Sequence, residues 1–303
     1  MAPRTNDEAP RNSRLSHRAV TALEALDRDT RALYERLRAA RCNVELSAAL
    51  ECRLADTQGT PLNVRVVLVP GILYRDYPET GADGALLREV CEQLELPFSV
   101  VPVDGTEGIE NAAVIIQDTL RHLPGTEPVL LFSLSKGSAE VRHALENEPG
   151  HTAFLRVSAW VSVSGLPFGT PSAEIILRRA LTRAMIRLWC WVKGWKLEVI
   201  RDLLRHRPHA PFPLPPHICF VQIAAFPLQT DLRDRRSRRL RRQLAALGPN
   251  DGFALLDELA NLPGLFHPMW GADHYLNGAG DLKLCLARLI RFLGSLSSTS
   301  AKS

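Results

Sequence analysis

The feature that most constrains this chain is an alternation, through its middle and C-terminal parts, of short apolar runs with amphipathic helical patterns. The runs cover residues 64–71, 97–105, 128–137, 157–165, 218–226 and 265–270. Almost continuously apolar runs of this length are typical of strands buried on both faces. Helical spacing of apolar residues fills most of the gaps, for example at 86–94, 109–123 and 282–293. This order predicts an α/β fold, in which a mostly parallel central sheet carries helices on both faces.

Length and cysteine usage narrow the class of protein further. At 303 residues the chain can form two average domains or one large α/β domain, with a sizeable core in either case. Its six cysteines occur singly, without a C-x-x-C pair, which indicates free thiols in a reducing compartment. The N-terminal segment lacks the apolar stretch of a signal peptide, and no long apolar run follows. These features predict a cytoplasmic protein that is neither disordered overall nor built on disulfides.

Composition divides the chain into a globular region and extensions. Residues 1–16 are rich in Pro, Asn, Ser and charge, so we expect a disordered tail. Apolar residues at helical spacing predict an amphipathic helix at about 18–41, and an extended pair is expected at about 43–55. We expect an N-terminal helical extension over 17–60, the α/β domain over 61–294, a helical cap insertion within it over 170–216, and a second disordered tail over 295–303.

A serine lies at the junction between a predicted strand and the helix after it. The sequence Ser133-Leu134-Ser135-Lys136-Gly137 closes the apolar run that begins at residue 128. A nucleophilic serine on a sharp strand-to-helix turn needs small residues two positions to either side, because the strained backbone leaves no room for branched side chains. Ser133 and Gly137 meet this requirement around Ser135. Catalytic groups of parallel sheets collect at such positions, just beyond the carboxyl ends of the strands.

This arrangement resembles the nucleophile elbow of the α/β-hydrolase superfamily, usually written G-x-S-x-G. Ser133 stands where the motif has its first glycine, a departure that keeps the side chain small. The resemblance extends from residue 64 to about residue 294. It implies a serine hydrolase of the esterase, lipase or thioesterase kind, which cleaves a small-molecule acyl ester or thioester through an acyl-enzyme. It requires no cofactor or metal.

The resemblance also implies where the other catalytic residues lie, because the superfamily has the chain order serine, acid, histidine. His274 follows the last predicted strand and precedes the last predicted helix, which is the place of the catalytic base. Asp251, in the turn 248–252, lies in the interval expected for the acid. Asp231 and Asp273 are alternatives, although the carboxylate of Asp273 would have to fold back onto the neighbouring ring. Each residue also has an ordinary interpretation, as an N-cap serine, a turn aspartate or a structural histidine.

Two backbone N–H groups complete the implied site by forming an oxyanion hole. One belongs to Lys136, directly after the nucleophile, and the other to Ile72, in the turn after the first predicted strand. Gly71 allows the backbone of that turn to approach the reacting carbonyl closely, and Gly137 supports the elbow.

Other catalytic patterns fit less well. Ser133 and Lys136 also form the S-x-x-K motif of β-lactamases, but the S-D-N and K-T-G motifs that accompany it are absent. The chain has no H-E-x-x-H, Walker A or G-x-G-x-x-G sequence, so we expect no metal and no nucleotide cofactor. A different class stays open: a non-catalytic protein of the same fold that binds or scaffolds, with Ser133 marking a lost activity.

Positive charge is concentrated in two segments. Residues 170–216 hold nine Lys or Arg against three acids, together with Trp189, Trp191 and Trp195, and residues 231–242 hold seven Arg against two Asp. An apolar helix face bordered by Trp and Arg suits peripheral association with an anionic membrane, but a helix packed on the sheet with a solvated basic face fits equally. No aromatic residues interleave with the arginines of 231–242, so we expect no nucleic-acid partner.

Overall fold

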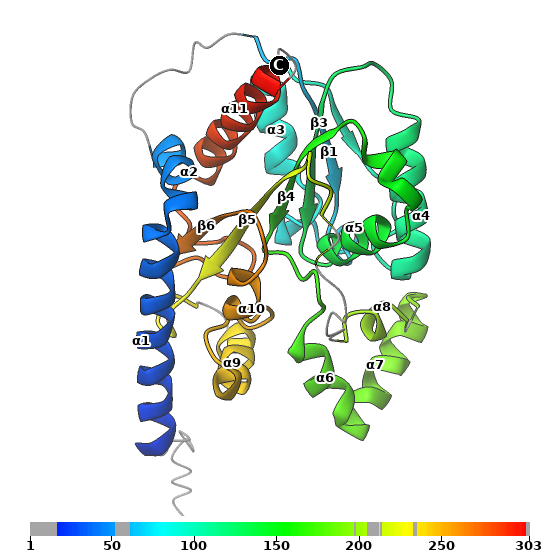
Figure 1. The fold of residues 1–303 in the computed structure, drawn as a ribbon. Helices are drawn as coiled ribbons and strands as arrows, with labels where there is room; N and C mark the ends of the chain where they lie inside the picture. Colours follow the sequence, from blue (N-terminus) through cyan, green and yellow to red (C-terminus); the bar gives the residue numbers. More distant parts are fainter. Residues whose placement is uncertain are drawn as a thin grey trace, which may run out of the picture.

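A parallel sheet forms the centre of the computed structural model, which describes residues 17–51, 61–196, 198–204, 212, 214–232 and 235–300 (Figure 1). Its six strands are β1 (Arg65–Val69), β2 (Phe98–Val100), β3 (Val129–Leu134), β4 (Val157–Val163), β5 (Cys219–Phe226) and β6 (Leu265–Trp270). They are arranged in the order β2-β1-β3-β4-β5-β6, and every neighbouring pair is parallel. The predicted fold class is therefore confirmed, and each strand lies within its predicted run.

The strands are apolar on both sides because helices cover both faces of the sheet. Val66 and Leu68 of β1 pack into one core cluster with residues of α3 (Ala85–Gln93) and α11 (Leu282–Ser300). Val67 and Val69, which point the other way, pack with residues of α4 (Ile109–Arg121) and α5 (Gly137–Glu146). Alternate side chains of a strand point to opposite faces, so a strand covered on both sides has no polar alternation. Three short 3₁₀ helices cover Pro78–Thr80, Pro149–Phe154 and Ala245–Leu247.

The N-terminal extension lies along strand β6, at one edge of the sheet (Figure 1). It consists of α1 (His17–Ala39) and α2 (Arg41–Glu51). The extended pair expected at 43–55 is wrong for 43–51, which are helical, and 52–55 lie outside the described residues. Two long-range contacts explain the difference. Leu46 and Leu50, one helical turn apart, are buried in the sheet core, and the Asn43 side chain donates to Leu37 O (2.8 Å) and accepts from Phe266 N (2.8 Å).

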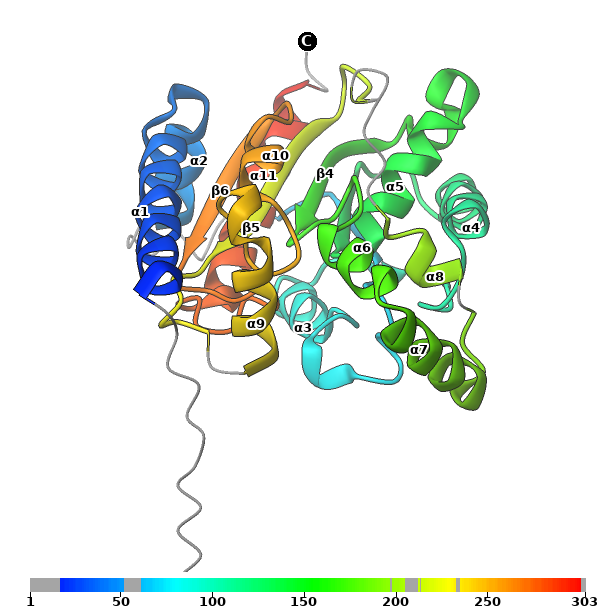
Figure 2. The ribbon, with the colours of Figure 1, turned by 90° about the horizontal axis from the view of Figure 1, so that it is seen from below.

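The described part of the insertion at 170–216 contains three helices, which lie beyond the carboxyl ends of the strands (Figure 1 and Figure 2). They are α6 (Pro171–Arg178), α7 (Ala180–Lys193) and α8 (Glu198–Arg201). Thr170 caps α6 by accepting a hydrogen bond from Ser172 N at 3.1 Å, and Pro171 occupies its first turn. Helices α6 and α7 are separate, because Arg179 between them has an extended backbone (φ −83°, ψ 116°). Residues 205–211 and 213 lie outside the described part.

The arginine-rich segment 231–242 forms most of α9 (Arg235–Leu244), and α10 (Leu256–Ala260) follows it.

The disordered tail expected over 295–303 is wrong for 295–300, which continue α11. There the Ser295 and Ser297 hydroxyls donate to the carbonyls of Phe292 and Leu293 (2.7 and 3.1 Å), so these side chains are accommodated within the helix. Residues 1–16 and 301–303 are not among those described. No helix in the described ranges has both the length and the apolarity needed to cross a membrane.

Candidate active site

Ser135 lies on the sharp turn between β3 and α5. Its backbone is left-handed (φ 47°), a conformation that costs energy for any residue with a side chain and is found at functional turns. Gly137 shows why the turn needs a small residue. A Cβ added to Gly137 would lie 2.8 Å from the carbonyl oxygens of both Val69 and Pro70, at the end of β1. Because β1 and β3 are neighbours in the sheet, a side chain at residue 137 would force the elbow or the end of β1 to move.

The departure at Ser133 has a structural explanation. Its side chain is fully buried beneath the turn, where its Oγ accepts a hydrogen bond from Trp160 Nε1 at 2.8 Å. The same oxygen lies 2.9 Å from Ser138 Oγ, which lies 2.9 Å from Ser162 Oγ. A buried indole N–H needs an acceptor, and a glycine at position 133 would remove this one. Ser133 thus takes part in a buried hydroxyl network under the elbow and leaves the backbone conformation of Ser135 intact.

Three residues from distant parts of the chain meet beyond the carboxyl ends of the strands. Ser135 Oγ lies 3.1 Å from His274 Nε2, and His274 Nδ1 lies 2.8 Å from Asp251 Oδ2. His274 follows β6, and Asp251 lies between β5 and β6 in the sequence. The histidine and the aspartate are both buried, at 5% and 1% exposure. The structure therefore brings together Ser135, His274 and Asp251 in a single chain of hydrogen bonds.

The carboxylate of Asp251 is held rigidly by its own loop. Its Oδ1 accepts hydrogen bonds from Phe253 N (2.8 Å) and Ala254 N (2.7 Å), which leaves Oδ2 for the imidazole. Asn250, the residue before it, accepts from Gly252 N at 3.0 Å and closes the turn. The ring of Phe253 lies 4.5 Å from the His274 ring, centroid to centroid. A carboxylate fixed in this way keeps the imidazole in one orientation.

Asp231 and Asp273 have other partners. Asp231 Oδ2 accepts from Leu228 N at 2.7 Å, in the turn that follows β5. Asp273 Oδ1 accepts from Tyr275 N (2.9 Å) and Asn277 N (3.0 Å), so it closes the turn that carries His274. Both carboxylates therefore stabilise local turns.

Comparison with solved structures connects this geometry to a known architecture. No protein-family model matches the sequence, and no curated protein matches it significantly. The metagenomic carboxyl esterase MGS0156 has 20% sequence identity and a TM-score of 0.56, over 91% of this chain and 92% of that one. The mature form of the Bacillus licheniformis lipase BlEst2 has 17% identity and a TM-score of 0.56, over 77% of this chain and 93% of that one. The chain has the α/β-hydrolase fold.

In an α/β-hydrolase fold the oxyanion hole is formed by two backbone N–H groups. Lys136 N lies at the start of α5, where unpaired helix N–H groups favour negative charge. Within the described residues neither this amide nor that of Ile72 has a hydrogen-bond acceptor. Gly71 donates to Ala82 O at 2.9 Å, and a Cβ added to it would lie 3.4 Å from Leu134 O, beside the elbow. The geometry is compatible with the two predicted donors, whose role stays a prediction.

The side chain of Lys136 forms a buried ion pair that sequence reasoning missed. Lys136 is 1% exposed, and its Nζ donates to Glu107 O at 2.9 Å and pairs with Glu140, which is equally buried. Burial raises the pKa of Glu140, although the lysine opposes that shift. The i, i+4 spacing of Lys136 and Glu140 was the available signal. Because Nζ contacts these two groups, and Ser133 contacts Trp160 and Ser138, the geometry does not support the β-lactamase-like interpretation of S-x-x-K.

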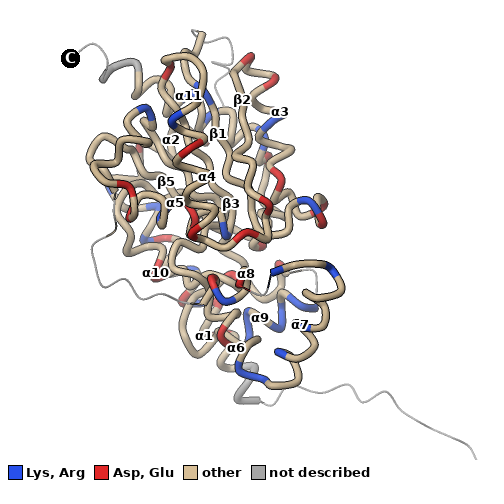
Figure 3. Tube along the Cα trace, turned by 90° about the vertical axis from the view of Figure 1, so that its right-hand side faces the viewer, with Lys and Arg blue, Asp and Glu red and all other residues tan. Residues whose placement is uncertain are grey.

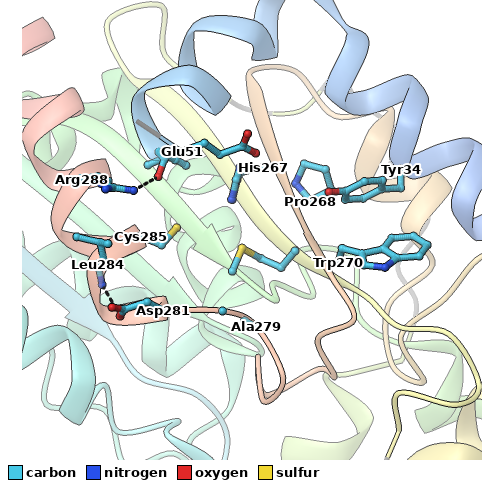
Figure 4. Close-up of a pocket in the computed structure, with 13 residues that line it drawn as sticks. Tyr34, Glu51, His267, Pro268, Trp270, Ala279, Asp281, Leu284, Cys285 and Arg288 are labelled. Atoms are coloured by element: carbon cyan, nitrogen blue, oxygen red, sulfur yellow. Dashed lines mark hydrogen bonds between the residues drawn. The ribbon is translucent and has the colours of Figure 1, made fainter. Parts of the chain in front are cut away.

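A separate cavity of about 270 Å³ lies between the N-terminal helices, β6 and α11 (Figure 4). His267 and Cys285 line it, whereas Ser135, His274 and Asp251 do not. Burial lowers the pKa of His267 to about 4 and raises that of Cys285 to about 11. Both groups are therefore uncharged at neutral pH, unlike an activated cysteine.

The five described cysteines are free thiols, and Cys52 lies outside the described residues. Among described side chains, no group of three or more His, Cys, Asp or Glu could hold a metal ion.

Proposed function

We propose that this protein is a serine hydrolase that cleaves a carboxylic ester or thioester of a small acyl substrate. The observation that carries the proposal is the hydrogen-bond chain from Ser135 Oγ to His274 and from His274 to Asp251, with contacts of 3.1 and 2.8 Å. A hydroxyl, an imidazole and a carboxylate in this order form the catalytic unit of acyl transfer. The fold shared with a carboxyl esterase and a lipase is compatible with this chemistry.

The first half of the reaction forms an acyl-enzyme. His274 Nε2 removes the proton of Ser135 as Oγ attacks the carbonyl carbon, and the carbonyl oxygen becomes a tetrahedral oxyanion. The N–H groups of Ile72 and Lys136 donate to that oxyanion. The intermediate then collapses, the bond to the leaving group breaks, and the imidazolium protonates the departing alcohol or thiol.

The second half returns the free enzyme. A water molecule gives a proton to His274 and attacks the acyl carbon, and the bond to Ser135 Oγ breaks as the imidazolium returns a proton to it. The carboxylic acid leaves. Throughout, Asp251 holds the Nδ1 proton of the imidazole and stabilises its positive charge, a role suited to a buried carboxylate whose second oxygen accepts two backbone N–H groups.

The test is covalent labelling with a fluorophosphonate, followed by identification of the modified peptide. We expect phosphonylation of Ser135 in the native protein and none in Ser135→Ala. Ser133→Ala is the matched control, because it removes a hydroxyl two residues away and keeps the nucleophile. Absence of labelling, together with absence of turnover on nitrophenyl and thioester substrates of several chain lengths, would favour a non-catalytic binding protein of the same fold.

A further inference from the structure

Helix α7 has its apolar face turned toward solvent. Of its fourteen residues only Cys190 is buried. Leu181, Met185 and Trp191 are 82%, 70% and 79% exposed, and Leu188 and Val192 are also exposed. A surface helix normally packs its apolar face against the core and exposes its polar face. Contiguous apolar exposure of this kind marks a surface that binds something.

The exposed residues form one broad arc of the helix. At the helical rotation of about 100° per residue, Leu181, Met185, Leu188 and Val192 share one stripe, and Trp189 and Trp191 lie toward its two borders. Cys190 lies on the opposite side, which is the side that contacts the protein. Trp189 also contacts Trp195, with ring centroids 4.8 Å apart. The insertion thus holds α7 by a narrow face and presents the wide apolar face outward.

Cations border this arc. Arg187 flanks it beside Trp191, and Lys193 flanks it beside Trp189, whereas α7 contains no acidic residue. Figure 3 shows basic positions, in blue, along α7. No carboxylate in the described part of the chain lies within ion-pair distance of Arg187 or Lys193. A second copy of the chain would bring the same positive charge to this face and be repelled, whereas an anionic surface would be attracted.

The insertion is bonded to the loop that carries Asp251. Thr170 Oγ1 donates to Phe253 O at 2.6 Å, and Ser172 Oγ donates to Gly252 O at 2.8 Å. At its other end Asp202 Oδ2 accepts from Ile109 N at 2.9 Å, which fixes the insertion to α4. Helix α7 lies beyond the carboxyl ends of the strands (Figure 1), which is the end of the sheet where Ser135 follows β3 and His274 follows β6.

We propose that α7 docks this protein on an anionic lipid surface. The stripe of Leu181, Met185, Leu188 and Val192 enters the boundary between head groups and acyl chains, and the flanking cations contact the head groups. Trp189 and Trp191 lie at the level of the interface, as aromatic residues at membrane surfaces do. The inference does not rest on the proposed hydrolysis, since it concerns a surface and no chemical step.

The experiment measures binding of full-length Ser135→Ala protein to vesicles, so that hydrolysis cannot alter the lipid. Vesicles of phosphatidylcholine alone are compared with vesicles that contain about 40% phosphatidylglycerol. We expect sedimentation with the anionic vesicles, a blue shift of tryptophan emission, and loss of binding at about 1 M salt, where charges are screened over roughly 3 Å.

Three double variants, one of them a control, separate the contributions of charge and of apolar surface to binding. Arg187→Gln with Lys193→Gln should weaken binding to anionic vesicles by roughly 25-fold, since each basic residue near such a surface contributes about fivefold. Arg41→Gln with Arg88→Gln is the matched control, because it removes the same charge from exposed positions outside the insertion and should change binding little. Leu181→Ser with Leu188→Ser should abolish binding, because it removes apolar surface from the stripe. Thermal unfolding should stay unchanged, because both side chains are exposed in the free protein.

Three results would overturn the proposal. The first is no binding of the parent protein to either vesicle. The second is equal loss of binding in the insertion variant and in the matched control, which would indicate a general charge effect. The third is a dimer in gel filtration that Leu181→Ser with Leu188→Ser converts to a monomer, because the apolar arc would then be an interface between copies of the chain.

Discussion

Arg241 of α9 pairs with Asp27 of α1, with Nη1 2.8 Å from Oδ1. The guanidinium is fully buried, and its Nη2 also donates to Thr30 Oγ1 at 3.3 Å. Burial lowers the pKa of Arg241, and Asp27 is the strongest of the nearby carboxylates that oppose this shift. A Cβ added to Gly252 would lie 3.6 Å from Arg241 N, so α9 lies beside the loop of Asp251. Helix α1 of the N-terminal extension and the arginine-rich helix α9 therefore contact each other, and α9 lies next to the loop that carries Asp251.

Removing one member of this pair should destabilise the fold. Asp27→Asn leaves a buried guanidinium without its counter-charge, and we expect a loss of about 3 kcal/mol in the free energy of unfolding in urea. Asp257→Asn is the control, because its partner on α1, Arg36, lies 3.6 Å away in an exposed pair worth less than about 1 kcal/mol. Equal losses in the two variants would contradict a structural role for Arg241.

The two serines of the elbow should have separable effects. Ser135→Ala should lower ester turnover by at least about a thousandfold without changing stability, because it removes the nucleophile. Ser133→Ala should keep activity but cost about 1–3 kcal/mol, because the buried Trp160 N–H loses its acceptor. Both are measured by steady-state kinetics and urea unfolding. A dead Ser133→Ala enzyme beside an active Ser135→Ala enzyme would refute the elbow assignment.

The three aspartates near the site should differ in their effect on kcat. Asp251→Asn should lower kcat by about 10⁴, because an amide no longer holds the imidazole tautomer or stabilises its charge. Asp273→Asn and Asp231→Asn should have much smaller effects, since their carboxylates accept hydrogen bonds within turns. A full-rate Asp251→Asn enzyme would be incompatible with the proposed catalytic role.

Gly137 should tolerate no side chain. Gly137→Ala places a methyl group 2.8 Å from two carbonyl oxygens of the β1 end, so the elbow has to move. We expect a loss of about 1–3 kcal/mol in stability and up to about a hundredfold in kcat/KM. Gly280→Ala is the matched control, because nothing lies within 4 Å of its added Cβ. If the two variants behave alike, the close approach of β1 and the elbow is not required.

His267 should make stability depend on pH. Burial lowers its folded-state pKa to about 4, whereas an unfolded histidine titrates near 6.5. Between these values the unfolded chain binds more protons than the folded one, so stability falls as pH falls from about 6.5 to about 4. Across this pH range the lowered pKa of His267 reduces the free energy of unfolding by about 3 kcal/mol. In His267→Gln the decline in the free energy of unfolding between pH 7 and pH 4 should be smaller by about this amount, and an unchanged decline would contradict it.

The elements that the sequence predicted well depend on local patterns. Val66 to Val69 are all apolar because helices cover both faces of β1, so that burial requires four consecutive apolar residues. The small residues around Ser135 are similarly local, because the tight turn restricts its own neighbours. Local patterns failed where a long-range contact decided the conformation. Residues 43–51 are helical because Leu46 and Leu50 reach the sheet core and Asn43 reaches β6.

What only the tertiary structure decided is which residues far apart in the sequence meet. Chain order favoured Asp251 as the partner of His274 but left Asp231 and Asp273 as alternatives, because the 2.8 Å contact depends on how two loops pack. The sequence of 231–242 indicates a strongly basic segment, yet Arg241 is buried against Asp27, which is more than two hundred residues away. The pattern of α7 predicted an amphipathic helix, but whether its apolar face is covered depends on what packs against it. The spacing of apolar residues predicts that a helix has an apolar and a polar face, but only the packing of the whole chain determines which face contacts solvent.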